Sequence, residues 1–169
     1  IAKTKKGYEC LKEQFQERTL TKKYLAFVYG EIKDRFGIIN RPIGRSPKDF
    51  RRWSATRGAR GEMRDAETWY ELLAYRSGFS FLEIEPRTGR THQIRVHFKA
   101  VNHPIVSDSL YAAEKPFALV FKRNALHAHS INFTNCEGKK ISVKAPVPKD
   151  FKAAFKELGI GEFAKIKGL

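Results

Sequence analysis

A short run of polar and basic residues in the middle of the chain has the composition of an anion-binding site. Gly89 and Arg90 lie just before a segment with apolar residues at helical spacing. The first turn of a helix presents backbone N–H groups and the positive end of the helix dipole, and a nearby guanidinium adds a full charge. Three more residues, His92, Arg95 and Lys99, fall at i, i+3 and i+7 and form a basic stripe. The pattern predicts a site for a phosphate or a carboxylate; a solvated basic helix face is the alternative interpretation.

A second basic region lies between residues 41 and 64 and shows no hydrophobic period. Its arginines and the aromatic residues among them are Arg41, Arg45, Arg51, Arg52, Arg57, Arg60, Arg64, Phe50 and Trp53. Arginine neutralises phosphate groups, and an aromatic ring stacks on an unpaired base. We therefore interpret this region as a surface that contacts an RNA backbone; a flexible, solvated loop is the alternative. The candidate contacts are Arg45, Arg51, Arg52 and Trp53.

The composition indicates a polyanionic partner. Lys and Arg number 33 against 18 Asp and Glu, which gives a formal net charge of +15 and a pI near 10.0. Nucleic acid is the first candidate for such a partner. With 169 residues and 41% hydrophobic content, the chain can bury one sizeable core. We expect one globular domain over residues 1–159 and a loose basic tail over residues 160–169.

Cysteine and histidine usage argues against a disulfide framework or a zinc site. Cys10 and Cys136 are far apart and form no Cys-x-x-Cys pair, so a reducing, cytoplasmic setting fits. His127 and His129 are two residues apart on a predicted strand and share a face, but no third ligand is near in sequence. We expect no metal, no cofactor and a monomer. No apolar run approaches the length of a membrane span, so no membrane partner is expected.

Two elements are predicted before residue 30. Tyr8, Leu11 and Phe15 recur at i, i+3 and i+7, which predicts a core-facing helix over about residues 5–18. The run over residues 22–29 alternates and is apolar on both faces, which predicts a central strand.

The rest of the chain mixes strands and helices without strict alternation. Residues 41–61 are expected to form a long structureless loop. One hairpin is predicted from strands over residues 66–75 and 79–85, with a bulge or burial on both faces of the second strand, and another from strands over 126–133 and 140–143.

Helix signals complete the expected fold. A helix is predicted over residues 92–101 with Thr91 as its N-cap, and a last helix over residues 151–158 with Asp150 as its cap. These elements together predict an α+β fold, a mixed but mainly antiparallel sheet with flanking helices.

One twelve-residue string is more specific than any spacing. It reads Arg87-Thr88-Gly89-Arg90-Thr91-His92-Gln93-Ile94-Arg95-Val96-His97-Phe98, and is followed by Asn102-His103-Pro104-Ile105-Val106 and Asp108-Ser109-Leu110-Tyr111. Further strings in order are Lys23-Tyr24-Leu25-Ala26-Phe27-Val28-Tyr29-Gly30, Leu126-His127-Ala128 and Ala145-Pro146-Val147-Pro148-Lys149-Asp150-Phe151. Together they closely resemble the signature of RluA-type RNA pseudouridine synthases. The resemblance covers nearly the whole chain and implies the pseudouridine synthase fold.

The resemblance also implies a reaction and the residues that serve it. In that family an aspartate attacks the target uridine, which is first flipped into a pocket; the base is detached from C1′, turned and rejoined through C5 without a cofactor. Tyr24 matches the tyrosine that packs on the uracil and helps in proton transfer, although by itself it would pass for a core tyrosine. Arg95 matches the basic residue that pairs with the catalytic carboxylate, which an arginine can hold ionised. Arg90, His92 and Lys99 are the candidate RNA contacts nearby.

The family's nucleophile is not in the expected place. It lies in an Arg-Leu-Asp-x-x-Thr-Ser-Gly motif that should come just before a strand ending like Ile1-Ala2-Lys3-Thr4, and the chain begins after that point. The aspartates considered instead, all in predicted loops or caps, are Asp34, Asp49, Asp65, Asp108 and Asp150. We therefore expect an N-terminally incomplete catalytic domain that is inactive alone.

Three functions are compatible with the sequence. The first is an RNA pseudouridine synthase that acts on uridines of ribosomal or transfer RNA. The second is a non-catalytic RNA-binding module on the same fold, in which the aspartate motif would be replaced. The third is a basic structural protein of the ribosome, which predicts no concave pocket near Tyr24 and Arg95. The first test is therefore whether these two side chains share one cavity.

Overall fold

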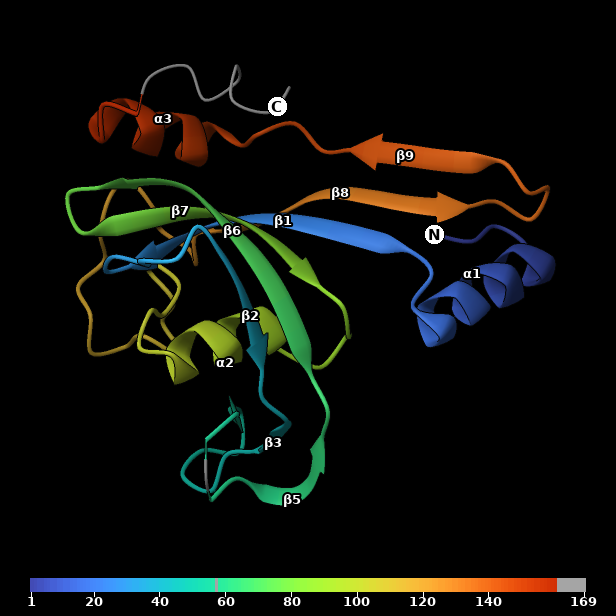
Figure 1. Cartoon of the computed structure of the whole chain (residues 1–169), viewed down its shortest axis with the longest axis horizontal. Coiled ribbons are helices and arrows are strands. Elements are labelled where there is room, and N and C mark those ends of the chain that lie inside the picture. The colour runs from blue at the N-terminus through green and yellow to red at the C-terminus, as the bar shows by residue number, and fades with distance from the viewer. Residues whose placement is uncertain (57, 161–169) are drawn as a thin grey trace.

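The computed structural model describes residues 1–56 and 58–160 and shows a large antiparallel sheet between helices (Figure 1). The elements in chain order are α1 (Lys5–Glu17), β1 (Thr21–Tyr29), β2 (Phe36–Asn40), β3 (Ile43–Arg45), β4 (Trp53–Ser54), β5 (Arg60–Arg64), β6 (Glu67–Arg76), β7 (Phe79–Pro86), α2 (Gln93–Ala100), β8 (Leu126–Thr134), β9 (Lys140–Lys144) and α3 (Lys149–Glu157). The larger sheet has six strands in the order β2-β6-β7-β1-β8-β9, and the smaller has three in the order β4-β3-β5. The predicted α+β class with a mainly antiparallel sheet is confirmed.

β1 is a central strand, as its apolar pattern predicted. It pairs with β7 on one side and β8 on the other, antiparallel in both cases. Residues 25–28 of this strand are completely buried. Burial of apolar area on both faces of one strand is the main contribution that this segment makes to stability.

Both predicted hairpins are present. The turn between β6 and β7 has Ser77 at φ 50° and Gly78 at φ 84°, the left-handed pair that fits the twist of a two-residue hairpin. For the second strand the structure shows burial on both faces, since Phe81 and Leu82 of β7 are both completely buried. The bulge of this hairpin lies in the other strand, between Leu72 and Ala74 of β6. The second hairpin joins β8 to β9 and keeps its register from Ser130 onward.

α2 covers one face of the sheet. Tyr24 of β1 and Tyr70 of β6 both lie opposite Ile84 of β7, so the three side chains share a face. The ring of Phe98 on α2 packs edge-on against Tyr70, with 5.6 Å between centroids. The side chains that follow Tyr24 at alternate positions of β1 therefore point toward α2.

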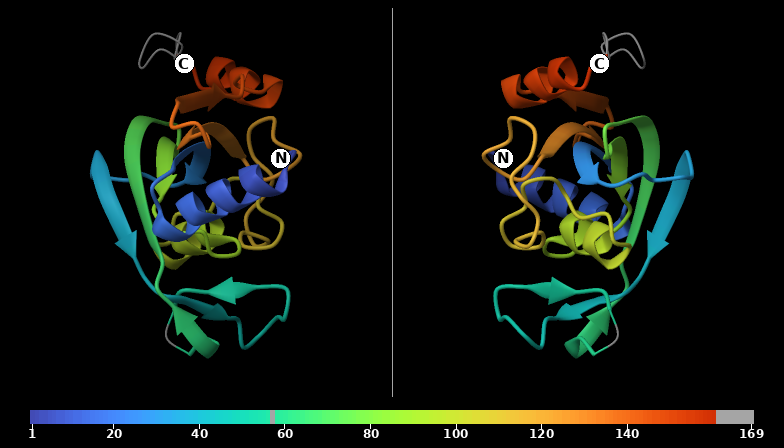
Figure 2. Two further views of the ribbon diagram at one scale, coloured as in Figure 1. Left: turned by 90° about the vertical axis from the view of Figure 1, so that its right-hand side faces the viewer. Right: turned by 90° about the vertical axis from the view of Figure 1, so that its left-hand side faces the viewer.

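α3 covers the opposite face, and Figure 2 shows the sheet between the two helices. Phe27 of β1 points away from α2 and packs on Phe151 of α3, with ring centroids 5.6 Å apart. Phe81, Phe121 and Phe155 complete this aromatic cluster. The two predicted helices over 92–101 and 151–158 thus close the core from both sides.

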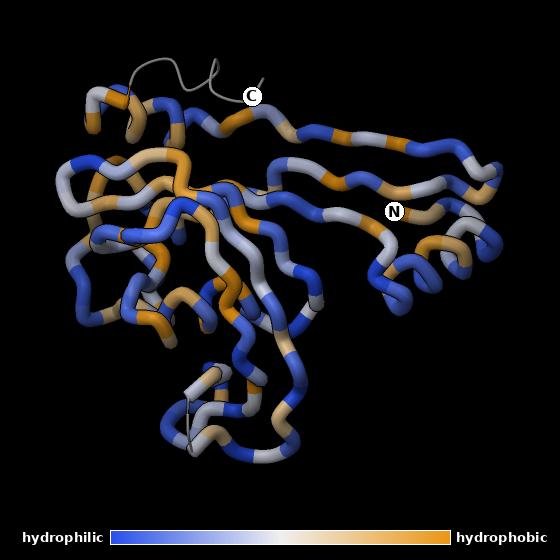
Figure 3. Tube along the Cα trace, viewed as in Figure 1, coloured by the Kyte–Doolittle hydropathy of each residue, from blue (hydrophilic) through white to orange (hydrophobic). Residues whose placement is uncertain are grey.

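The prediction that the first helix faces the core is wrong. α1 has no buried residue, and Tyr8 and Phe15 of its apolar stripe are 59% and 53% exposed. Figure 3 shows hydrophobic and hydrophilic residues mixed along α1, which extends beyond the sheet. The helix is anchored by Gln14, whose amide group exchanges hydrogen bonds with the backbone of Thr134 at the end of β8. Periodicity identified the apolar face correctly but not what would cover it.

The predicted structureless loop over 41–61 is also wrong, because β3, β4 and β5 form a small sheet there. These strands have two to five residues, and β5 is exposed throughout, so they leave no readable period. We call residues 41–65 the arm. Its inner side joins a second small core in which Ile43 packs near Val96 of α2 and Tyr111. The arm is thus attached to the helix that carries the predicted site.

The predicted helix caps are corrected by the structure. α2 begins after His92, which has φ 55° and makes no side-chain cap bond, so Thr91 is not the N-cap. α3 begins after Pro148, and Asp150 lies in its first turn, where it forms an ion pair with Arg123.

Two predicted features fall partly or wholly outside the described residues. Of the predicted tail, Ile160 packs against the core, and residues 161–169 lie outside the described residues, as does Arg57 of the basic region. No helix in the described part of the chain has the length and apolar character needed to cross a membrane.

Candidate active site

Tyr24 and Arg95 line one cavity of about 270 Å³. It lies between β1, the end of β7 and the first turn of α2, and it is open to solvent beside Lys22, Arg90 and His92. The convergence of the two side chains agrees with the prediction. A structural ribosomal protein predicted no such pocket, so the geometry disfavours that alternative.

The position of Tyr24 is set by an irregularity in the sheet. Its neighbours are Ile84 in β7 and Ala128 in β8. The β1–β8 register shifts between Lys23 and Tyr24, and His129 is the additional residue on β8. Bulges of this kind bend a strand and redirect its side chains. Burial raises the pKa of Tyr24, so the phenol keeps its proton at neutral pH.

Arg95 is held by a carboxylate from a later loop. Its Nε and Nη2 atoms donate to the two oxygens of Asp108, each at 2.6 Å. The Asp108 side chain is completely buried and also accepts the backbone N–H groups of Leu110 and Tyr111 at 3.0 Å. Burial by itself would raise the pKa of Asp108, but these hydrogen bonds and the Arg95 charge lower it. The guanidinium is therefore fixed in one orientation at the cavity wall.

The Tyr111 side chain connects the cavity to the arm. Its ring lies 4.8 Å from the Arg95 guanidinium. Its hydroxyl accepts the backbone N–H of Trp53 at 3.0 Å and lies 2.9 Å from Nδ1 of His92. Burial, followed by the nearby Arg95 charge, lowers the pKa of His92. The imidazole is thus neutral at physiological pH. In the neutral ring, Nδ1 can accept a hydrogen bond from the Tyr111 hydroxyl, and Nε2–H stays available as a donor.

The loop over residues 87–90 is closed by one buried amide. Oε1 of Gln93 accepts from the Thr88 hydroxyl at 2.7 Å and from the backbone N–H of Arg90 at 3.0 Å. Its Nε2 donates to Glu67 and Thr68 of β6. The side chain of Arg90 is held separately, by the backbone carbonyl of Asp65 at 3.0 Å. The residues of the predicted anion site therefore form an ordered loop that Gln93 closes, in which the backbone N–H of Arg90 is already bonded; anion binding there stays a prediction.

The predicted RNA contacts fall into three places. Arg90 and His92 line the cavity. Arg45, Arg51, Arg52 and Trp53 lie on the arm, where the Arg45 guanidinium stacks over Trp53 at 4.2 Å. Lys99 is apart from both, ion-paired with Glu114. The basic stripe predicted along α2 is therefore divided, because Arg95 turns inward to Asp108 and Lys99 turns outward.

Three residues of the site were missed by sequence reasoning. Asp108 and Tyr111 belong to a string that carried the resemblance. Their contacts with Arg95 span 13 and 16 positions, so no local sequence pattern predicts these contacts. Lys22 lines the cavity two residues before Tyr24. The strand's two-residue repeat places it on the same face, which was a usable signal.

The cavity offers stacking and positive charge rather than metal ligands. Its lining includes no carboxylate and no thiol. Within residues 1–56 and 58–160, no three His, Cys, Asp or Glu side chains are grouped to hold a metal ion. His127 and His129 do share a face of β8, with ring centroids 6.0 Å apart. What converges at the cavity is an aromatic ring with a phenolic proton, a fixed guanidinium and a basic rim.

Comparison with known proteins identifies the family. Residues 1–100 match the family described as RNA pseudouridylate synthase. The chain belongs to this family. An uncharacterised RNA pseudouridine synthase of Synechocystis is 37% identical over 152 residues, which is 89% of this chain and 46% of that protein. The ribosomal large subunit pseudouridine synthase D of Xanthomonas campestris is 36% identical over 162 residues, covering 89% of this chain and 47% of its own length.

A solved structure of the same family supports the fold. Human RNA pseudouridylate synthase domain containing 1 is 28% identical with a TM-score of 0.75, covering 86% of this chain and 62% of that one. The chain spans about half the length of the curated relatives it matches. Because the structural match covers 86% of the chain, the chain shares the family's fold over nearly all of its own length.

Proposed function

We propose that this chain forms the uridine-binding cavity of an enzyme that isomerises uridine to pseudouridine in RNA. The observation that carries the proposal is the convergence of Tyr24 and Arg95 on one cavity in a chain of this family. The everted uracil packs on the Tyr24 ring, and the basic rim at Lys22 and Arg90 receives the flanking phosphates. The raised pKa of Tyr24 keeps a proton available at the base.

Arg95 serves this reaction by orientation. Its bond to Asp108 fixes the guanidinium plane, while the Tyr111 ring lies beside it. In that position it offers positive charge to a nucleophilic carboxylate in the cavity. Asp108 is not that nucleophile, because it is completely buried, it is held by four hydrogen bonds and it does not line the cavity.

The proposal extends to the substrate and setting. We propose ribosomal RNA as the first substrate to test, because relatives include three named ribosomal large subunit pseudouridine synthase D. Transfer RNA is the second. We also propose a monomer and a reducing, cytoplasmic compartment. The compartment fits Cys10 and Cys136, which are far apart in sequence but adjacent in the structure, and which are both free thiols.

Pseudouridine formation tests the proposal directly. The protein as its native cell produces it is incubated with ribosomal and transfer RNA, and pseudouridine is measured by mass spectrometry of the digested RNA. Tyr24→Phe removes the phenolic proton but keeps the ring, and should lower kcat about a hundredfold with little change in KM. Tyr75→Phe, at the far end of β6, is the matched control and should behave as wild type.

Two outcomes would overturn the catalytic assignment. RNA binding without isomerisation by the protein as its native cell produces it would favour the non-catalytic RNA-binding module. Equal kinetics for Tyr24→Phe and wild type would remove Tyr24 from the reaction. The 169 residues themselves are expected to bind uridine-containing RNA without converting it, and pseudouridine formed by them alone would refute that expectation.

A further inference from the structure

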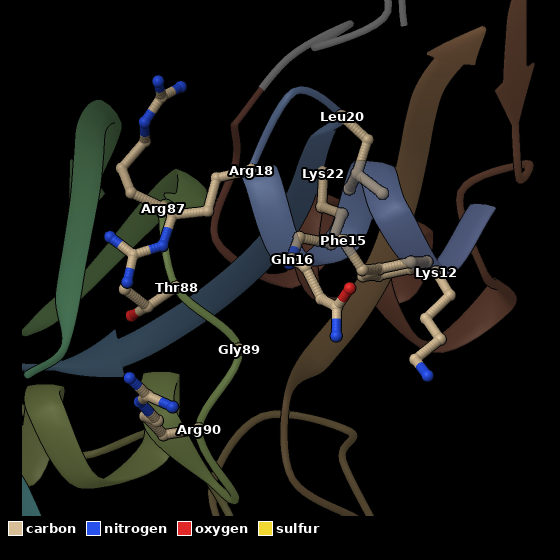
Figure 4. A pocket seen from close by; sticks show the side chains of 10 residues that line it. All are labelled: Lys12, Phe15, Gln16, Arg18, Leu20, Lys22, Arg87, Thr88, Gly89 and Arg90. Atoms are coloured by element: carbon tan, nitrogen blue, oxygen red, sulfur yellow. The ribbon is translucent and has the colours of Figure 1, made fainter. Parts of the chain in front are cut away.

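A second cavity adjoins the first, between α1 and the loop over residues 87–90 (Figure 4). Its volume is about 360 Å³, and none of the residues that line it is acidic. We call it the basic cleft. The lining side chains that matter for its chemistry are Lys12, Phe15, Arg18, Lys22, Arg87 and Arg90.

Most of the positive charge in the basic cleft is not neutralised by the protein. Among the described residues, Lys12, Arg18 and Lys22 form no ion pair with a carboxylate, whereas Arg87 is paired with Glu85. The Lys22 side chain is half-buried, and this burial lowers its pKa. A cation in that position attracts an anion more strongly than one in bulk solvent.

The cleft also contains an aromatic surface. Phe15 is 53% exposed, although it belongs to the apolar stripe of α1. The Lys22 ammonium lies 5.5 Å from the centre of this ring. The same nitrogen would be 3.9 Å from a Cβ placed on Gly89, so Lys22 spans the space between the helix and the loop. A ring beside a cation is the combination that holds a nucleotide, with its base stacked and its phosphate paired.

The basic cleft and the uracil cavity are continuous. Lys22, Thr88, Gly89 and Arg90 line both. A nucleotide everted into the Tyr24 cavity remains attached to the strand through its two phosphates. One of these connections must therefore leave the cavity near the shared residues. This continuity favours an RNA strand over an acidic peptide or a free anion.

We propose that the basic cleft binds the nucleotide adjacent to the everted uridine, with its base on Phe15 and its phosphate among Lys12, Arg18 and Lys22. This inference rests on the proposed function and adds a flanking subsite to it. It makes α1 part of the RNA-binding surface, and explains why an apolar ring on this helix is left open to solvent. Arg90 stands between the two subsites and contributes to both.

A thermodynamic cycle tests the contact between Phe15 and a base. Dissociation constants are measured for the chain and a short single-stranded RNA with one central uridine, by fluorescence anisotropy. In a second RNA, the nucleotide on one side of that uridine is abasic, and a third RNA has the abasic site on the other side. For wild type, one of these should bind about tenfold more weakly than the intact RNA, because stacking on an aromatic ring is worth about 1–3 kcal/mol per base.

Phe15→Ala should bind the intact RNA about tenfold more weakly than wild type does. It should bind the abasic RNA that weakens wild-type binding no more weakly than the intact RNA. A merely structural role for Phe15 would weaken all three RNAs equally, and that result would overturn the proposal. Phe36→Ala is the matched control: Phe36 is 63% exposed and has a cation over its ring, but it lies on β2 outside the cleft. It should bind all three RNAs as wild type does.

The phosphate contact has its own test. Lys12→Ala should reduce the salt dependence of RNA binding by about one unit of the logarithmic slope. Inorganic phosphate at millimolar concentration should not displace the RNA. Complete displacement by phosphate, together with no effect of either abasic site, would show a general anion site and overturn the inference.

The failure of this inference can be told apart from failure of the proposed function. Replacing the central uridine by cytidine should weaken wild-type binding, and Tyr24→Leu should abolish that preference. If this holds while Phe15→Ala has no effect, the flanking subsite is wrong and the uridine cavity stands. If wild type shows no preference for uridine, the proposed function itself fails.

Discussion

Two arginine–aspartate pairs, one at the cavity and one on the arm, have similar geometry and very different surroundings. Arg95 binds Asp108 through two bonds of 2.6 Å, and Arg51 binds Asp49 through bonds of 2.9 and 3.1 Å. The Arg95 and Asp108 side chains are 17% and 0% exposed, whereas the Arg51 and Asp49 side chains are 65% and 17% exposed. A buried pair is difficult to separate, while an exposed pair exchanges readily with water or another anion.

This difference distinguishes the tasks of the two regions. At the cavity, the arginine is committed to one carboxylate and keeps one orientation for the chemistry. On the arm, Arg51 and Arg52 share Asp49 in an exposed setting, and in the RNA contact that we propose they would exchange this carboxylate for a phosphate. The hydrogen bonds of Tyr111 join the two regions, so a rigid cavity carries a surface whose charges remain available.

Matched substitutions of the two aspartates should have the largest effect. Asp108→Ala leaves the partly buried Arg95 guanidinium and the backbone N–H groups of Leu110 and Tyr111 without their partner, which should cost about 3 kcal/mol of unfolding free energy. Asp49→Ala removes the same type of pair from the arm and should leave the urea midpoint close to wild type. Urea denaturation followed by circular dichroism measures both. Similar losses in the two variants would show that burial does not distinguish the pairs.

Tyr111→Phe tests whether the arm is held to the cavity by one hydroxyl. The variant leaves the Trp53 N–H and the His92 Nδ1 without this partner, at a cost of about 1–3 kcal/mol. Limited proteolysis should then cut the arm faster than in wild type. Tyr8→Phe, on the exposed stripe of α1, is the control and should change neither the free energy of unfolding nor the cleavage rate of the arm. An unchanged cleavage rate in Tyr111→Phe would mean that the small core around Ile43 holds the arm by itself.

A pH dependence should appear in the framework that supports the cavity. Burial lowers the pKa of His97, whose ring lies 2.9 Å from both the Thr68 hydroxyl and the carbonyl of Arg41. The unfolded chain therefore binds the proton first as the pH falls, so the stabilisation present above about pH 6.5 is lost below it. We expect a loss of about 1 kcal/mol of unfolding free energy between pH 7.5 and 5.5. His97→Gln should reduce this dependence without abolishing it, because burial also lowers the pKa values of His92, His127 and His129. An unaltered pH profile would contradict the assignment.

The sequence predicted those parts of the fold whose signals are local. β1 and both hairpins follow from alternation and turn residues, and Tyr24 and Arg95 follow from a resemblance spread over the chain. The Asp108 contact was not predictable, because it joins a loop to a helix 13 positions away and depends on the packed core. The exposure of α1 was missed for a related reason: an amphipathic pattern gives the direction of a face and not the element that meets it.

The smallest expected effect concerns a single arginine of the arm. Arg51→Ala should leave the urea midpoint unchanged, since the Arg51 side chain is largely exposed. Its effect should appear in RNA binding. The slope of the logarithm of the binding constant against the logarithm of the salt concentration should decrease in magnitude by about one. Arg35→Ala is the matched control, because Arg35 is 73% exposed and ion-paired with Glu71 at the end of the β2–β6 pair away from the arm. If both variants lowered the slope equally, the RNA would be attracted by the charge of the whole molecule and not by the arm. A change in Arg51→Ala alone would place the bound RNA on the arm.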